Sequence, residues 1–380
     1  MIAQAPTLGA ALPDLFWRTG AIYRAAITAA LALYMGSGLA AEPATPALAD
    51  YQPAIAVSGT LRNYGGDYGG LLHRWEEGFR HFHPDLKFVD TLPGSDVATA
   101  GLISGAADIG TSGREAMLVE LEAFHDSAGT DLEQIPVATG TLDVKGTTWT
   151  PVVVVRDDNP IKGLTLQQLD GIFGAARTGG YQGYHWSPAG ARSAREDIRT
   201  WGQLGLRGEW SGKAIQTYGY APTGVTNFFQ QVVMNGGSKW NPNYREYVEA
   251  GSKLISPTPD GAALGTDRML AAVSADRFAI AWGGLRQAKA FPRLRVVPLA
   301  AVAGGPYIMP TRATLQDRTY PLTRSIYMFV RRSADGKLDE RVREFLSYVL
   351  SKQGQEEVSA GGVYLPLTAG TIALQRQRLN

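Results

Sequence analysis

Strand and helix patterns alternate along most of this chain, and the alternation limits the possible folds more than any other feature. Short apolar runs at residues 55–57 and 86–89 predict two strands, with a glycine-rich loop at residues 59–70 after the first. Apolar residues at helical spacing from Asp67 onward predict a helix between these strands, and a second helix is expected at residues 95–103. Elements in this order form a largely parallel sheet, with ligands at the carboxyl ends of its strands.

The next stretch, AADIGTSGRE at residues 106–115, has the residue types of an anion site. Gly110 and Gly113 remove side-chain bulk, so backbone N–H groups can face a ligand. Ser112 adds a hydroxyl donor, and Arg114 adds a permanent positive charge. We expect a strand that ends in a turn, opens a helix and holds an oxyanion. A plain surface turn is the alternative.

The second half of the chain predicts another α/β unit. A β-branched run at residues 151–155 indicates a buried strand, and Thr165 is placed to cap a helix at residues 166–173. Residues 174–200, rich in Gly, Ala and Arg, are expected to form an inserted surface loop. Further strands are predicted at residues 214–218, 278–282, 294–297 and 325–330, and further helices from Thr223 and at residues 338–350. Trp201 and Trp282 are expected in the core.

Charge and cysteine content restrict the possible partners. The 380 residues include 36 Lys and Arg against 35 Asp and Glu, which gives a net charge of +1. No broad field therefore favours a nucleic acid or an anionic membrane, and any anion site must be local. The chain has no cysteine, so it has neither disulfides nor a thiol for a lipid anchor.

The first forty or so residues have the composition of a secretory signal peptide, predicted at residues 1–41. Arg18 and Arg24 precede an apolar run at residues 25–33, and small residues follow. This run is shorter than the ~20 residues that a membrane span needs. We therefore expect an exported, periplasmic protein, with secretion as the alternative.

Several segments resemble, in order and spacing, the phosphate-binding proteins that serve as receptors of phosphate ABC importers. They are GSDVATAGLISGAADIGTSGRE (94–115), PVVVVRDDNP (151–160), LTLQQLDGIFG (164–174), TWGQLG (200–205), AIAWGGL (279–285), YPLTRSIYMFV (320–330) and GGVYLPL (361–367). The resemblance implies an α/β fold, the two-lobed periplasmic-binding-protein type II fold, with mixed, mainly parallel sheets and a ligand cleft between the lobes. It places lobe I at residues 53–150 with 321–372 and lobe II at residues 151–320.

The resemblance also implies a function and a set of ligand contacts. The protein is expected to capture inorganic phosphate or a related oxyanion, as a monomer, and to deliver it to the permease of an ABC importer. The contacts carried over from the family lie at helix starts and tight turns: Tyr64, Gly66, Asp67, Ser95, Ser112, Gly113, Arg114, Thr223, Gly224, Val225 and Thr226.

Two positions depart from the family pattern. Gly219 stands where many members have an arginine, four residues before the turn at Thr223. Gly113 stands where some members have an aspartate, which accepts the phosphate proton and so excludes sulfate. We hypothesise that Asp67 replaces the proton acceptor and that Arg62 or Arg114 replaces the cation.

Other functions have less support in the sequence. The turn at residues 110–113 lacks the spacing of a serine nucleophile, so no catalytic residue and no enzymatic activity are expected. The histidines His73, His81 and His83 lack a ligand spacing, so neither a metal nor another cofactor is expected. Asp108 is expected to order its turn or to pair with Arg114. An oxyanion sensor or secreted scavenger without transport remains the alternative function.

Overall fold

The computed structural model describes residues 48–142, 144, 148–248 and 265–380. The predicted signal peptide at residues 1–41 lies outside this part of the chain. Within the described ranges, none of the helices combines the length and the apolar character needed to cross a bilayer.

The first sheet has five strands in the order β2-β1-β3-β14-β4. β1 pairs in parallel with β2 and β3, whereas β14 is antiparallel to β3 and β4. A strand from near the end of the chain therefore lies inside a sheet built from its beginning. The bounds are β1 (Gly59–Gly65), β2 (Leu86–Thr91), β3 (Ile109–Ser112), β4 (Glu133–Thr139) and β14 (Ser325–Val330).

The second sheet repeats this pattern in the order β10-β9-β11-β5-β12. β9 pairs in parallel with β10 and β11, and β5 is antiparallel to β11 and β12. Both sheets are mixed, and the two-lobed α/β organisation is the one expected from the sequence. The bounds are β5 (Pro151–Arg156), β9 (Gln216–Tyr220), β10 (Arg245–Tyr247), β11 (Ala279–Gly284) and β12 (Leu294–Val296).

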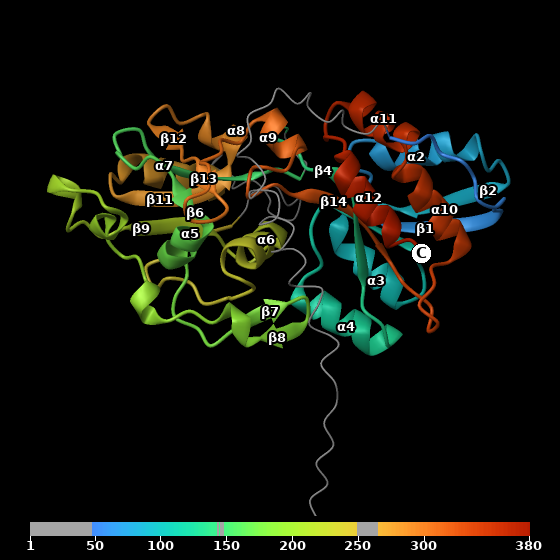
Figure 1. Ribbon diagram of the computed structural model, residues 1–380, viewed down its shortest axis with the longest axis horizontal. Helices are drawn as coiled ribbons and strands as arrows, with labels where there is room; N and C mark the ends of the chain where they lie inside the picture. Colours follow the sequence, from blue (N-terminus) through green and yellow to red (C-terminus); the bar gives the residue numbers. More distant parts are fainter. Residues whose placement is uncertain (1–47, 143, 145–147, 249–264) are drawn as a thin grey trace, which may run out of the picture. The chain divides into compact units, whose positions relative to one another are not determined.

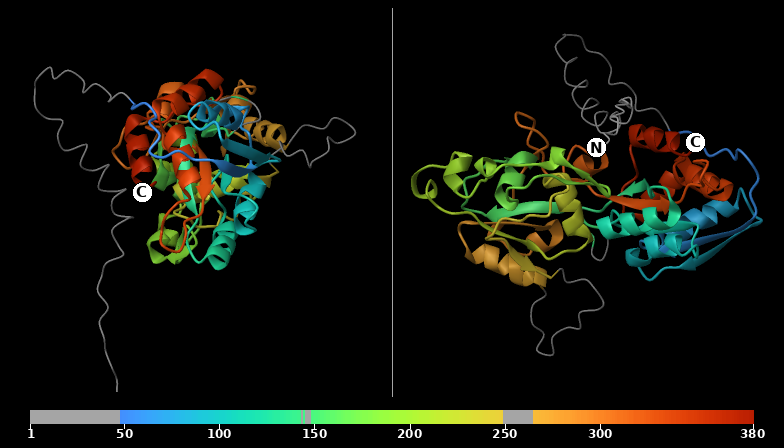
Figure 2. Two further views of the ribbon diagram at one scale, coloured as in Figure 1. Left: turned by 90° about the vertical axis from the view of Figure 1, so that its right-hand side faces the viewer. Right: turned by 90° about the horizontal axis from the view of Figure 1, so that it is seen from below.

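Helices from both ends of the chain pack together beside the first sheet. Helices α10 and α11, red in Figures 1 and 2, lie against α2. Trp75 on α2 donates its indole N–H to the Gly354 carbonyl at 2.7 Å, and α10 buries Val342, Phe345 and Val349. The bounds are α2 (Leu71–Arg80), α3 (Ala98–Ile103), α4 (Leu118–Ala128), α10 (Glu340–Val349), α11 (Lys352–Gly361) and α12 (Ala369–Gln377).

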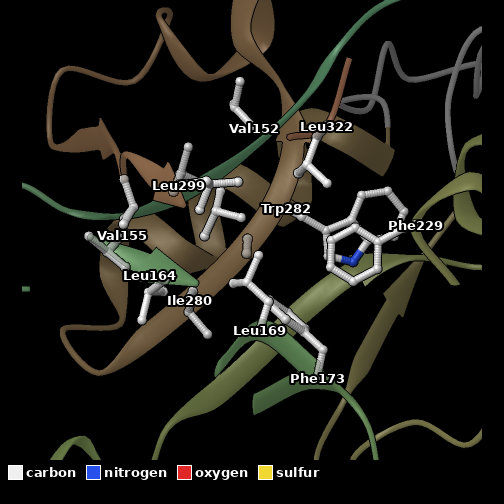
Figure 3. Close-up of a cluster of buried hydrophobic side chains, with 14 of the residues drawn as sticks. Val152, Val155, Leu164, Leu169, Phe173, Phe229, Ile280, Trp282, Leu299 and Leu322 are labelled. Atoms are coloured by element: carbon white, nitrogen blue, oxygen red, sulfur yellow. The ribbon is translucent and has the colours of Figure 1, made fainter. Parts of the chain in front are cut away.

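The second sheet is the centre of a separate hydrophobic core (Figure 3). Trp282 stacks on Phe229 with ring centroids 4.6 Å apart, and Trp201 and Trp282 are both fully buried, as predicted. Thr165 caps its helix by accepting from Gln168 N–H at 3.0 Å, also as predicted. The helices are α5 (Leu166–Phe173), α6 (Gly224–Val233), α7 (Gly265–Ala275), α8 (Leu285–Ala288) and α9 (Arg312–Gln316). Short strands complete this half: β6 (Leu164–Thr165), β7 (Gly180–Gln182), β8 (His185–Ser187) and β13 (Leu299–Ala300).

Three predicted elements were wrong. Residues 55–57 are not a strand, since β1 begins at Gly59 and occupies the first part of the predicted glycine-rich loop. The helix after the anion-type turn begins only at Leu118. Residues 174–200 form more than a surface loop, because they contain the β7–β8 hairpin and the buried Arg177, which pairs with Asp170 of α5 at an N to O distance of 2.6 Å.

Candidate anion-binding site

Gly113, directly after β3, is the centre of a small hydrogen-bonded group. Its N–H donates to Ser95 Oγ at 3.1 Å, and Ser95 Oγ lies 2.9 Å from the Tyr68 hydroxyl. The Tyr68 hydroxyl also donates to the Thr111 carbonyl at 3.1 Å. Two predicted ligand residues, Ser95 and Gly113, therefore lie together, with Tyr68 beside them.

Tyr68 is held in an unusual conformation at this point. Its φ of 53° lies in the left-handed region, which a bulky residue adopts only when its surroundings hold it there. A Cβ at Gly66 would lie 2.6 Å from the Tyr68 ring, and a Cβ at Gly113 would lie 2.9 Å from it, so both glycines make room for the ring. Burial raises the pKa of Tyr68 to about 12. Its hydroxyl therefore remains a proton donor at neutral pH.

The turn after Gly113 uses its polar groups internally. The Ser112 hydroxyl donates to the Arg114 carbonyl at 2.7 Å and accepts the Arg114 N–H at 3.2 Å. The Arg114 guanidinium donates to both carboxylate oxygens of Glu120, at 2.7 and 2.8 Å. It also donates to Asp96 Oδ1 at 2.9 Å and to the Glu115 carbonyl at 3.1 Å. Each terminal nitrogen of Arg114 thus already makes two hydrogen bonds.

The start of α6 brings the second group of predicted residues to the same place. A Cβ at Gly224 would lie 2.2 Å from Arg114 Cδ, so the helix start and the Arg114 turn are in contact. The first N–H groups of a helix have no acceptor within it, and here they belong to Gly224, Val225 and Thr226. The Val225 and Thr226 side chains are buried, and the Thr226 hydroxyl donates to the Ala221 carbonyl at 2.8 Å. These residues can therefore offer an anion their backbone N–H groups.

The three predicted residues of the first loop are placed differently from one another. The Tyr64 ring packs on α3, since a Cβ at Gly101 would lie 2.7 Å from it. Gly66 donates its N–H to the Thr111 carbonyl at 3.2 Å. The Asp67 carboxylate accepts from the Gly70 N–H at 2.7 Å and lies 2.8 Å from His73 Nδ1, so it caps the start of α2.

The predicted pairing of Asp108 with Arg114 was wrong. Asp108 instead pairs with Arg62, through Arg62 Nη2 to Oδ1 at 2.7 Å and Arg62 Nε to Oδ2 at 3.0 Å. This happens because Asp108 precedes β3 and lies beside β1, which carries Arg62. Arg62 is therefore engaged in an ion pair next to β1.

Two residues beside Gly113 were not predicted. Arg324 is 4% exposed, and its guanidinium donates to the Gly113 carbonyl at 3.3 Å and to the Trp149 carbonyl at 3.5 Å. Glu115 Oε2 lies 4.0 Å from the Arg324 guanidinium and is buried without a hydrogen-bond partner among the described residues. The buried Arg324 guanidinium, whose hydrogen bonds are long, and the buried Glu115 Oε2 thus lie next to the predicted site. Arg324 belongs to the return segment just before β14, so only the folded chain brings it here.

Comparison with known proteins adds a sequence relationship to this geometry. No protein-family model matches the chain. The chain is 31% identical over 337 residues to the "Phosphate-binding protein PstS" of Pseudomonas aeruginosa. The alignment covers 88% of this chain and 91% of the relative. The chain belongs to the PstS family. "Protein SphX" of Synechococcus elongatus is 26% identical over 73% of this chain and 68% of its own length. The solved structure of PstS from Borrelia burgdorferi aligns over 82% of this chain and 99% of its own, with 15% identity and a TM-score of 0.47.

The two positions at which this PstS-family chain departs from the family pattern have no room for a side chain. A Cβ at Gly219 would lie 2.1 Å from the Tyr244 hydroxyl and 2.3 Å from Trp282 Nε1. A Cβ at Gly113 would lie 2.4 Å from Thr148 Oγ1. A side chain at either position would therefore require these neighbouring side chains to move.

Proposed function

We propose that this protein captures inorganic phosphate between its two lobes and delivers it to the permease of an ABC importer. The observation that carries the proposal is the sequence match to a phosphate-binding PstS protein over nearly the whole of both chains. Relatives named for binding also support a binding role rather than catalysis. Delivery from the periplasm, as a monomer that has lost residues 1–41, is part of the same proposal.

The two lobes proposed to close on the anion are residues 53–150 with 321–372, and residues 151–320. The chain passes between the two sheets once before β5 and once before β14. These two connections are the natural hinge. Strands β5 and β14 are also the antiparallel strands of the two sheets, so each connection enters the lobe at an inner strand.

The proposed anion contacts come from both lobes. The first lobe contributes Ser95 Oγ and the N–H of Gly113, which exchange their mutual hydrogen bond for bonds to the anion. The start of α6 contributes the N–H groups of Gly224, Val225 and Thr226 and the hydroxyl of Thr223, close to the positive end of a helix. Hydrogen bonds to a charged group contribute about 1.5–3 kcal/mol each. Four to six of them are enough for the about 8 kcal/mol of a micromolar complex after desolvation.

Arg324 is proposed as the cation of the site. It takes the role of the family arginine, at whose position this chain has Gly219. The carbonyls at the ends of its long hydrogen bonds are weaker acceptors than a phosphate oxygen. Arg114 contributes charge, but its hydrogen bonds are committed to Glu120 and Asp96. This favours Arg324 over the two arginines considered from the sequence.

Glu115 is proposed as the acceptor of the phosphate proton. Within the described part of the chain its Oε2 is buried without a hydrogen-bond partner, while Oε1 accepts from the Tyr327 hydroxyl at 2.8 Å. A fixed carboxylate oxygen accepts a hydrogen bond from the P–OH group of hydrogen phosphate and repels fully ionised sulfate, which has no proton to donate. Asp67, the acceptor hypothesised from the sequence, is less suitable because its carboxylate caps α2.

Titration calorimetry of the mature protein tests the proposal. The protein is unfolded and refolded to remove any ligand carried over, and phosphate is then added with and without sulfate as competitor. We expect micromolar or tighter phosphate binding that excess sulfate does not displace. A folded protein that gives no heat with phosphate would refute the proposed ligand.

A further inference from the structure

Three potential metal ligands lie near the ends of β1 and β2. They are His73 and Glu76 on α2 and Asp90 on β2, and one ligand atom from each lies within 4.8 Å of the others. His73 and Glu76 are three residues apart on a helix, so their side chains leave the same face. His73 Nε2 lies 3.9 Å from Asp90 Oδ2.

The buried carboxylate of Glu76 is the first feature that points to a cation. Glu76 is 1% exposed, and its Oε2 has no hydrogen-bond partner in the ranges that the structure describes. The Arg80 guanidinium lies 3.9 Å from this oxygen, which is too far for a hydrogen bond. Asn63 Nδ2 donates to Glu76 Oε1 at 2.7 Å and to Asp90 Oδ1 at 2.9 Å, and so holds the two carboxylates next to each other. Two neighbouring carboxylates, one of them buried, are stabilised by a shared cation.

The orientation of His73 is the second feature. Its Nδ1 lies 2.8 Å from Asp67 Oδ1, and Asp67 is itself fixed by accepting from the Gly70 N–H at 2.7 Å. A proton on Nδ1 donated to Asp67 leaves the lone pair of Nε2 on the side of Asp90. A carboxylate that orients a histidine in this way is typical of histidine ligands in metal sites.

We propose that His73, Glu76 and Asp90 bind a divalent zinc-type metal ion, with water as the fourth ligand. One imidazole nitrogen with two carboxylates suits Zn²⁺, whereas Mg²⁺ and Ca²⁺ prefer oxygen ligands alone. Zinc bonds of about 2.1 Å hold tetrahedral ligands about 3.4 Å apart. The ligand atoms here lie within 4.8 Å of one another, so the three side chains need to approach by up to about 1.4 Å, and His73 and Asp90 by about 0.5 Å. The side chain of His73 is 60% exposed and has room for that movement. The bound ion links the start of α2 to β2.

Calorimetric titration of the EDTA-treated mature protein with ZnCl₂ tests this site, with MgCl₂ as the comparison. The variants are His73→Gln and Glu76→Gln, and the control is His81→Gln, an exposed histidine just after the same helix. We expect one Zn²⁺ per chain and a higher midpoint of thermal unfolding with Zn²⁺. Each of the two site variants weakens Zn²⁺ binding at least 30-fold, and the control leaves it unchanged.

Three results would overturn the proposal. They are no heat with Zn²⁺ from the folded wild type, equal Zn²⁺ affinity in His73→Gln, and a loss of affinity in His81→Gln as large as in the site variants. Because His73 is largely exposed, His73→Gln keeps the test valid even if Glu76→Gln fails to fold. The titration contains no phosphate, so its outcome is independent of the proposed phosphate function.

Discussion

Replacing Arg324 by glutamine is expected to weaken phosphate binding more than any other single loss of charge in the first lobe. The Arg324 side chain is 5% exposed, so little water screens its interaction with an anion. Its hydrogen bonds to the Gly113 and Trp149 carbonyls are 3.3 and 3.5 Å long, so little is lost when it turns to a phosphate oxygen. A charge-assisted hydrogen bond contributes about 1.5–3 kcal/mol. Arg324→Gln should therefore raise the phosphate Kd about 10- to 150-fold.

The control for this measurement is Arg331→Gln. Arg331 follows the other end of β14, where it donates to the Leu102 carbonyl at 2.7 Å. Both variants lose one charge next to the same strand, and both are titrated with phosphate by calorimetry after their thermal unfolding has been checked. The reasoning is refuted if folded Arg324→Gln binds phosphate within threefold of the wild type. It is also refuted if Arg331→Gln weakens binding equally.

Three further predictions concern selectivity, pH and packing. Glu115→Gln should narrow the preference for phosphate over sulfate at least tenfold in competition calorimetry, because an amide can donate to sulfate; an unchanged ratio would argue against Glu115 as the proton acceptor. Burial lowers the pKa of His83 below its usual value near 6.5. As the pH falls below about 6.5, His83 is therefore protonated in the unfolded chain before it is protonated in the folded protein, and the stability of the fold decreases. The free energy of unfolding measured in urea should therefore fall between pH 7.5 and 5.5 by more in the wild type than in His83→Asn, and equal losses would contradict this. Gly219→Ala places a Cβ 2.1 Å from the Tyr244 hydroxyl and should cost about 1–3 kcal/mol in urea unfolding. Gly212→Ala, with nothing within 4 Å of the added Cβ, is the control, and an equal cost would show that the clash is relieved.

The periodic, strongly apolar elements could be predicted from the sequence, and the glycine-rich ones could not. The buried strand β5 and the helix α10 have clear apolar patterns, and both were found close to the predicted residues. β1 was missed because its buried positions include the polar Asn63 and because glycines at both ends look like a loop. Those glycines, Gly59 and Gly65, are the first and last residues of β1. Their φ values of 94° and 142° are ones that glycine adopts readily.

The arrangement of the candidate site could be predicted from the sequence only in part. Ser95, Gly113 and Gly224 lie at turns or helix starts, whose backbone geometry follows from local sequence, and the structure brings them together. The partners of the charged residues could not be predicted, because Arg324 reaches Gly113 across 211 residues. The partners of Arg114 and Asp67 depend in the same way on which carboxylates and N–H groups the folded turns present.

The position of β14 has a consequence for the order in which the chain can fold. Because β14 lies between β3 and β4, the first sheet lacks an inner strand until residue 330 of the 380 has been synthesised. Until then β3 and β4 lack the strand that lies between them. These two strands, at residues 109–112 and 133–139, are synthesised about 200 residues before β14. Most domains at the start of a chain fold while the rest is still being made. Here the second sheet, whose last strand ends at Val296, can be completed before the first sheet, which waits for β14.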